Sequence, residues 1–253
     1  MVGMFPFTMG ILGVASYAAD AAVFDGVNDD LQSTSALSTV ADGKEGILSI
    51  WVRFNSTAGD GVLQNIIQSS GSAFEVRKAT DNTIEFATIA STAAVNVYQY
   101  VSTGTFTSTS TAWRHFLYTW SEANGFGARI NASTSGVGSL PANSTRTTDY
   151  SVSEWAVGGS VTGSGRLYGD LCDVYLNVSP DGGGIGTVLT KFIASGKPVD
   201  LGSSGDTPTG TAPIMYLHMD DGAVVTTFPT NLGSGSSFAI TGTLVASTSS
   251  PTD

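Results

Sequence analysis

Apolar and polar residues alternate along most of the chain, in short runs separated by turn residues. In residues 46–54 the apolar side of the run holds Leu48, Ile50, Val52 and Phe54, as in a half-buried strand. Further strands are predicted at residues 62–68, 73–78, 83–89, 95–101, 113–120, 126–131, 155–157, 167–178, 214–219 and 238–245. Short strands at this spacing predict an all-β sandwich or barrel.

The pattern changes after Pro180. A glycine-rich break at residues 181–184 precedes the best helix candidate, residues 187–195, and Gly196 suits the end of that helix. Residues 181–253 are too few and too rich in loops to predict an independent domain. We expect a short helix, a loop and C-terminal strands packed on the same sandwich.

Residues 1–21 form an apolar segment rich in small residues. A signal peptide begins with basic residues, whereas the first basic residue of this chain is Lys44. Glycines and a proline interrupt the segment, which is also too short to span a bilayer. We therefore expect an apolar arm that packs on a neighbouring subunit, with a cleaved leader as the alternative.

Composition and charge narrow the classes of protein. Only 12% of the 253 residues are charged, about half the usual share, which argues against a helix-rich protein. The net charge of −11 argues against a nucleic-acid partner, because binding to phosphates depends on Lys and Arg. The single cysteine, Cys172, excludes a disulfide framework within the chain and a cysteine-based zinc site.

Four segments, taken in order, resemble motifs of the laminin-G-like, or concanavalin A-like, jelly-roll family. They are FDGVND at 24–29, LSIWV at 48–52, WRHFLYTW at 113–120 with its partner at 125–131, and YGDLCDVY at 168–175. The resemblance covers residues 22–180 and implies a jelly-roll sandwich. It does not specify a function, because this fold hosts lectins, glycosidases, adhesive modules and coat proteins.

The C-terminal residues carry a second resemblance. Residues 216–222 and 231–244 resemble the segment that opens many laminin-G-like chains. This implies a permuted order, in which the Gly/Ser-rich C-terminal extension completes the sheet. The stretch 191–211 and the tail also resemble uncharacterised laminin-G-like proteins of tailed bacteriophages, which implies a structural role in a virus particle.

The acidic residues do not form the pair that a glycoside hydrolase needs. That reaction uses two carboxylates that flank the scissile bond. Glu75 and Glu85 lie on separate predicted strands, and Asp170 and Asp173 are three residues apart, so they point to opposite faces of a strand. The sequence therefore predicts that this protein is not an enzyme.

Two other features indicate structure rather than chemistry. Cys172 and a histidine could form a nucleophilic pair, but a lone cysteine within a strand is far more often a buried hydrophobe. The glycine-rich residues 158–165 lack the spacing and the lysine of a phosphate-binding loop, and they predict hairpin turns.

Two ligands remain candidates. Relatives of this fold hold a structural calcium ion, and the resemblance implies Asp173 as one ligand and Asp25 as the nearest early carboxylate; the alternative is no cofactor, with Asp173 bonded to a turn amide. A glycan would need exposed aromatic side chains, for which Tyr150 and Trp155 are candidates. Both aromatic residues would serve equally well in the core.

These observations lead to three functional hypotheses. The first is a non-enzymatic structural protein on the surface of a tailed-phage virion, a capsid decoration protein or alternatively a tail component. It would be attached through its termini to major capsid or tail proteins and to further copies of itself. The second is a glycan-binding adhesin on the same fold that recognises a cell surface. The third, a glycoside hydrolase, is disfavoured. Neither nucleic acid nor a membrane is an expected partner.

Overall fold

The computed structural model describes residues 17, 19–33, 35, 37, 41–90, 93–142, 145–178, 184–220 and 222–253. Within these residues the chain forms two seven-stranded antiparallel sheets packed face to face. This arrangement is the all-β jelly-roll sandwich that the strand pattern and the resemblance predict. Most of the predicted arm, residues 1–21, lies outside the described residues.

The first sheet contains β1 (Ala22–Asp25), β3 (Gly46–Arg53), β8 (Arg114–Ser121), β9 (Gly125–Ile130), β11 (Tyr168–Asn177), β14 (Met215–Leu217) and β16 (Val245–Ala246). Its order is β16-β1-β11-β3-β8-β9, and β14 pairs with β11 beyond the end of β1. The second sheet contains β2 (Asp30–Ser33), β4 (Gln64–Ser69), β5 (Phe74–Lys78), β6 (Ile84–Ala90), β7 (Ala93–Val101), β10 (Trp155–Val157) and β15 (Ala239–Thr241). Its order is β15-β2-β10-β4-β5-β6-β7.

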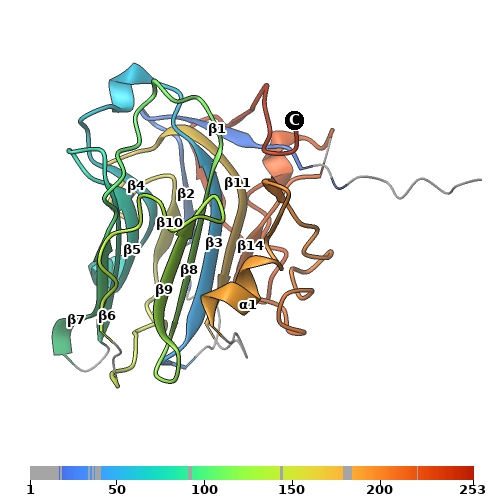
Figure 1. The fold of residues 1–253 in the computed structure, drawn as a ribbon. Helices are drawn as coiled ribbons and strands as arrows, with labels where there is room; N and C mark the ends of the chain where they lie inside the picture. The colour runs from blue at the N-terminus through green and yellow to red at the C-terminus, as the bar shows by residue number, and fades with distance from the viewer. Residues whose placement is uncertain are drawn as a thin grey trace, which may run out of the picture.

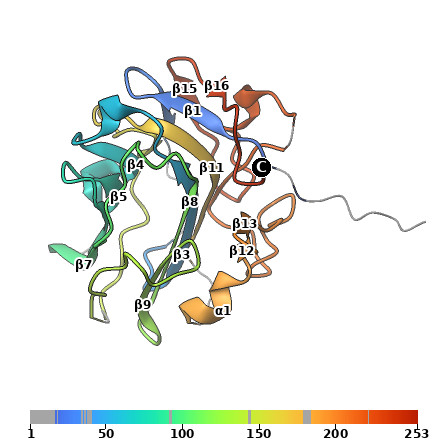
Figure 2. The same cartoon turned by 45° about the horizontal axis from the view of Figure 1, so that its top comes forward.

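The C-terminal strands complete both sheets, which confirms the expectation drawn from the tail. In the first sheet β14 pairs with β11 and β16 pairs with β1, while β15 pairs with β2 in the second sheet. The tail thus supplies strands at the sheet edges, as Figure 2 shows for β16 beside β1.

Aromatic and branched side chains fill the space between the sheets. On β3, Leu48, Ile50 and Val52 face this core, as the alternation predicts. The largest fully buried core side chains from the other strands include Phe24, Phe74, Phe86, Tyr98, Tyr100, Tyr118, Trp120 and Trp155. Each large apolar side chain buried in this way contributes about 1.5–3 kcal/mol.

A third layer covers the outer face of the first sheet. Here Ile47, Leu117 and Tyr175 pack against the C-terminal side chains Val188, Phe192, Leu201 and Tyr216. The same layer is visible on the outer side of β3 and β11 in Figure 1. The expectation that residues 46–54 form a half-buried strand is therefore wrong: nearly all of β3 is buried, because the C-terminal residues cover its second face.

The helical expectation for residues 187–195 is only partly correct. The helix α1 (Ile185–Leu189) ends early, and β12 (Ile193–Ala194) pairs with β13 (Lys197–Pro198) as a hairpin. Its two turn residues, Ser195 and Gly196, have φ values of 52° and 79°, which suit a two-residue hairpin turn. The other helical turns are η1 (Thr57–Gly59), η2 (Ser70–Ser72) and η3 (Val225–Thr227). Among the described residues no helix is long and apolar enough to cross a membrane.

Candidate functional site

The two candidate sugar-binding aromatic residues lie in the core. Trp155 is 0% exposed and its ring lies 5.6 Å from that of Phe74. Tyr150 is 1% exposed; its hydroxyl accepts a hydrogen bond from Trp120 Nε1 at 2.7 Å and donates one to the carbonyl of Glu45 at 3.1 Å. The structure therefore decides between the two alternatives in favour of the core, and neither ring offers a surface to a glycan.

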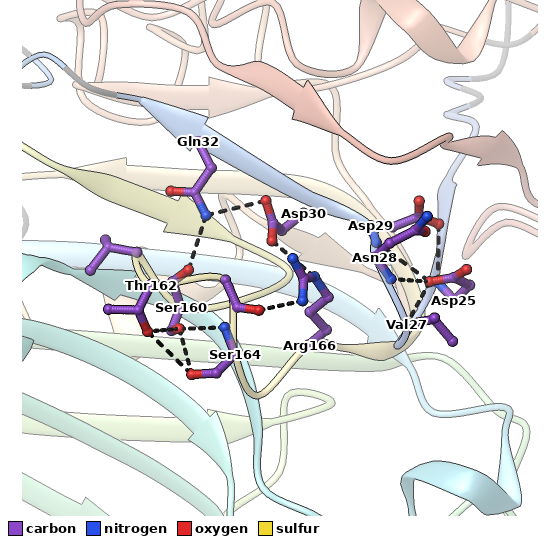
Figure 3. Close-up of polar contacts among 12 residues, drawn as sticks. Asp25, Val27, Asn28, Asp29, Asp30, Gln32, Ser160, Thr162, Ser164 and Arg166 are labelled. Carbon is purple, nitrogen blue, oxygen red and sulfur yellow. Dashed lines mark hydrogen bonds and ion pairs between the residues drawn. The ribbon is translucent and has the colours of Figure 1, made fainter.

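The two candidate calcium ligands are far apart. Asp25 on β1 pairs with Tyr168, whereas Asp173 lies five residues further along β11, or about 17 Å in an extended strand. Burial opposes ionisation of Asp25, but backbone N–H groups of Val27 and Asn28 outweigh it and lower the pKa of this carboxyl (Figure 3). Asp25 and Asp173 therefore do not share one ion, and the described residues contain no cluster of three His, Cys, Asp or Glu suited to a metal.

A cleft of about 340 Å³ lies on the outer face of the second sheet, between β4, β5 and the loop of residues 160–164. We call it the polar cleft. Its hydrogen-bonding side chains are Asn65, Gln68, Ser69, Ser72, Glu75, Arg77, Ser160, Thr162 and Ser164. Leu63 and Val161 add apolar surface at its walls. No aromatic ring lines it, so a ligand would be held chiefly by hydrogen bonds.

A bulge in β4 places polar side chains at this cleft. The register of β4 with β5 shifts between Asn65 and Ile67, so that Ile66 and Ile67 both enter the core. The polar residues on either side of them, Asn65 and Gln68, consequently both line the cleft. Asn65 is 3% exposed, and its Oδ1 is buried without a hydrogen-bond partner. Leaving a buried hydrogen-bond acceptor unpaired costs about 1–3 kcal/mol of folding free energy. Asn65 Oδ1 is therefore a group in the cleft wall that would gain from a hydrogen-bond donor.

Charged side chains from β5 and β6 hold one another in place beside the cleft. Arg77 Nε lies 2.6 Å from Glu85 and its Nη1 lies 3.2 Å from Glu75. Partial burial opposes the charge of Arg77, but these two carboxylates outweigh it and raise the pKa of the guanidinium. Gln68 Nε2 donates to Glu75 at 3.1 Å. The outward-facing groups of β4 and β5 are therefore fixed before any ligand arrives.

An ion pair with β2 braces the loop that forms the opposite wall. Arg166 Nε lies 3.0 Å from Oδ2 of the buried Asp30, and a second guanidinium nitrogen donates to the carbonyl of Gly163. Gln32 Nε2 donates to the carbonyl of Ser160 at 2.9 Å. Figure 3 shows these bonds converging on the loop from β2. A rigid strand thus positions a glycine-rich segment that would otherwise be flexible.

Three hydroxyl groups gather on that loop. Ser160 Oγ lies 2.9 Å from both Thr162 Oγ1 and Ser164 Oγ, and it also accepts the backbone N–H of Ser164 (Figure 3). Each hydroxyl can donate and accept, so the cluster can reorient its hydrogen bonds toward a ligand. From sequence, this segment predicts only hairpin turns. The cleft was missed because its residues come from three separated segments, and the available signal was merely a set of outward-facing polar positions.

No protein-family model matches this chain, and no curated protein matches its sequence. Several solved structures are similar at low identity. A Bacteroides ovatus protein described as a candidate carbohydrate-binding protein is 12% identical over 91% of this chain and 59% of its own, with a TM-score of 0.49. Domains LG4-5 of the mouse laminin α1 chain are 10% identical over 64% of this chain and 42% of theirs, with a TM-score of 0.45.

A third similar structure is the ligand-binding domain of botulinum neurotoxin serotype D in complex with N-acetylneuraminic acid. It is 13% identical over 62% of this chain and 42% of its own, with a TM-score of 0.38. The chain thus spans 59% or less of the length of these three structures.

Proposed function

We propose that this protein is a non-enzymatic binding module that holds a neutral glycan in the polar cleft. The observation that carries this proposal is the concentration of hydroxyl, amide and charged groups around one hollow, one of them the unpaired acceptor of Asn65. Sugar hydroxyls both donate and accept, so they match such a lining. A ligand hydroxyl would supply the partner that Asn65 Oδ1 lacks, after a small rotation of a side-chain amide whose last torsion is broad.

The charges beside the cleft favour a neutral ligand. Arg77 is paired with both Glu75 and Glu85, so the single cation is already outnumbered by carboxylates. A sulfated or phosphorylated glycan would meet repulsion there, whereas a neutral oligosaccharide would not.

The arrangement of carboxylates supports binding rather than hydrolysis. A glycosidase places two carboxyl groups on opposite sides of the scissile bond. Here Glu75 lines the cleft but Glu85 does not, and both bind the same guanidinium. We therefore propose that the cleft binds a glycan without hydrolysing it.

A glycan array with multivalent display tests this proposal with full-length protein. Asn65→Leu removes the unpaired acceptor while keeping the volume, so we expect loss of binding with an unchanged or raised free energy of unfolding. Gln99→Ala is the matched control, because Gln99 is exposed on β7 of the same sheet and does not line the cleft. Equal binding of neutral glycans by wild type and Asn65→Leu, or no binding by wild type, would refute the proposal.

We also propose, as a second candidate, a structural role on the surface of a tailed-phage particle. The favouring observation is that the end of the apolar segment of residues 1–21 is bound to the sandwich. Tyr17 donates to Asp173 Oδ2 at 2.9 Å, and the backbone N–H of Asp20 donates to the carbonyl of Met219 at 2.9 Å. We propose that the apolar residues 1–16, which precede this point, are buried on a capsid protein, a tail protein or another copy of the chain.

The burial of residues 19 and 21 determines how much of the N-terminus can be deleted in a test of the structural role. Ala19 and Ala21 are each 1% exposed, so they belong to the sandwich although the sequence assigned them to the arm. Deleting residues 1–16 should leave the melting temperature unchanged, abolish co-sedimentation with phage particles, and reduce the mass measured by light scattering. Normal co-sedimentation of the truncated protein would contradict the structural role, whatever the outcome of the glycan array.

A further inference from the structure

A second hollow, of about 270 Å³, lies apart from the polar cleft at the start of β8 and the end of β9. We call it the Arg114 hollow. Its lining includes Phe106, Arg114, Ile130 and Asn131 together with Gly104 and Gly136. It shares no lining residue with the polar cleft, so the two can be tested separately.

The cation of this hollow has no carboxylate partner. Arg114 Nη2 donates to Ser110 Oγ at 2.6 Å, and no carboxylate of the described residues lies within ion-pair distance of it. By contrast, Arg53, Arg77 and Arg166 each bind an acid. A guanidinium has five N–H donors in a planar arrangement that matches the two oxygens of a carboxylate. Arg114 uses one nitrogen to bind Ser110, so its other N–H groups can bind a ligand.

The walls beside Arg114 are apolar and spacious. Phe106 and Ile130 are nearly buried, and the ring of Phe106 meets that of Phe116 edge to face at 5.1 Å. A Cβ added to Gly104 would lie 3.4 Å from the Cα of Gly136. Larger side chains at these glycines would occupy the hollow, so small residues keep it open.

We propose that the Arg114 hollow binds a small carboxylate with a flat apolar body. The carboxylate pairs with the guanidinium of Arg114, and the apolar body lies against Phe106 and Ile130. The volume is just below the range of about 300–1,000 Å³ usual for drug-sized ligands, so it accommodates a single ring with its acid group. The net charge of −11 disfavours anions at long range, but charges beyond about 8 Å are screened at physiological ionic strength. The nearby guanidinium therefore decides the local preference.

Benzoate and its neutral isostere benzamide provide a matched pair of probes. We expect full-length protein to bind benzoate at least tenfold more tightly than benzamide, measured by chemical-shift titration. Arg114→Gln should abolish this discrimination. Arg129→Gln is the matched control, because Arg129 is also half-buried and without a carboxylate partner among the described residues, yet it does not line the hollow.

A second variant tests the volume of the hollow rather than its charge. Gly104→Val places its Cβ beside Phe106 and leaves the guanidinium of Arg114 in the sequence, so it should weaken binding of both probes while the melting temperature shows that the protein is folded. The proposal is overturned if wild type fails to bind benzoate at millimolar concentrations, if Arg114→Gln binds benzoate as tightly as wild type, or if Gly104→Val folds and binds unchanged.

Discussion

His218 couples the stability of the sandwich to pH. It follows β14, where Asp173 of β11 and Tyr17 of the N-terminal segment meet. Its Nδ1 lies 2.6 Å from Asp173 Oδ1 and its Nε2 lies 3.0 Å from Asp220 Oδ1. The rings of Tyr17 and Tyr216 stack on the imidazole at 5.7 and 5.5 Å. The imidazole is thus enclosed by two aromatic rings and bonded to two carboxylates.

The size of the effect follows from the pKa of this imidazole. Burial disfavours the imidazolium, but the hydrogen bonds and charges of Asp173 and Asp220 outweigh burial and raise the pKa of His218 from 6.5 to about 8. At 1.36 kcal/mol per pKa unit, this corresponds to about 2 kcal/mol of stability. Because the folded pKa is the higher one, this contribution is fully present below pH 6.5 and is lost as the pH rises through 8.

Denaturant unfolding of wild type and His218→Gln from pH 6 to 9 measures this directly. The unfolding free energy of wild type relative to that of His218→Gln should fall by about 2 kcal/mol over this range, because the contribution of His115 is common to both proteins and cancels. Asp220→Asn is the control for the exposed partner: its side chain is 88% exposed, so solvent screens its charge and most of the pH dependence should remain. Equal pH dependence in wild type and His218→Gln would refute this account of His218.

Two further predictions concern the core. Trp155→Ala should cost about 3–5 kcal/mol in denaturant unfolding, because a fully buried indole is replaced by a cavity, and a loss below 1 kcal/mol would place Trp155 at the surface. Burial lowers the pKa of His115 from 6.5 to about 3, so the folded state resists the proton that the unfolded state takes up. The unfolding free energy of wild type relative to that of His115→Phe should therefore fall by about 2 kcal/mol between pH 6.5 and 5; parallel curves would contradict this assignment.

The sandwich was largely predictable from local pattern. The core side of β3 follows from strict alternation at Leu48, Ile50 and Val52. In contrast, β2 was missed because Leu31 is its only apolar residue and its neighbours are polar residues typical of turns. The coverage of the second face of β3 also escaped prediction, because it depends on residues 184–220, whose packing is not encoded near β3.

The candidate site was hardly predictable from the sequence, because it also depends on contacts between residues far apart in the chain. Tyr150 and Trp155 carry polar groups that suit a surface, yet the Tyr150 hydroxyl finds buried partners in Trp120 and the carbonyl of Glu45. Single-sequence patterns do not show such long-range partners. The polar cleft depends on a bulge beside Asn65 and on the ion pair between Asp30 and Arg166, which joins segments far apart in the sequence.

Asp173, which the resemblance implies as a calcium ligand, has a visible structural task. Asp173 lies where β11 shifts its register with β3, and its φ of 46° places it in the left-handed region, at a cost of about 1–3 kcal/mol. Its two carboxylate oxygens bind Tyr17 and His218, and hydrogen bonds to charged groups return about 1.5–3 kcal/mol each. The same carboxylate therefore anchors the N-terminal segment and the C-terminal strand β14. Deprotonation of His218 above pH 8 weakens one side of this junction, so the attachment proposed for residues 1–16 should weaken in the same pH range as the fold.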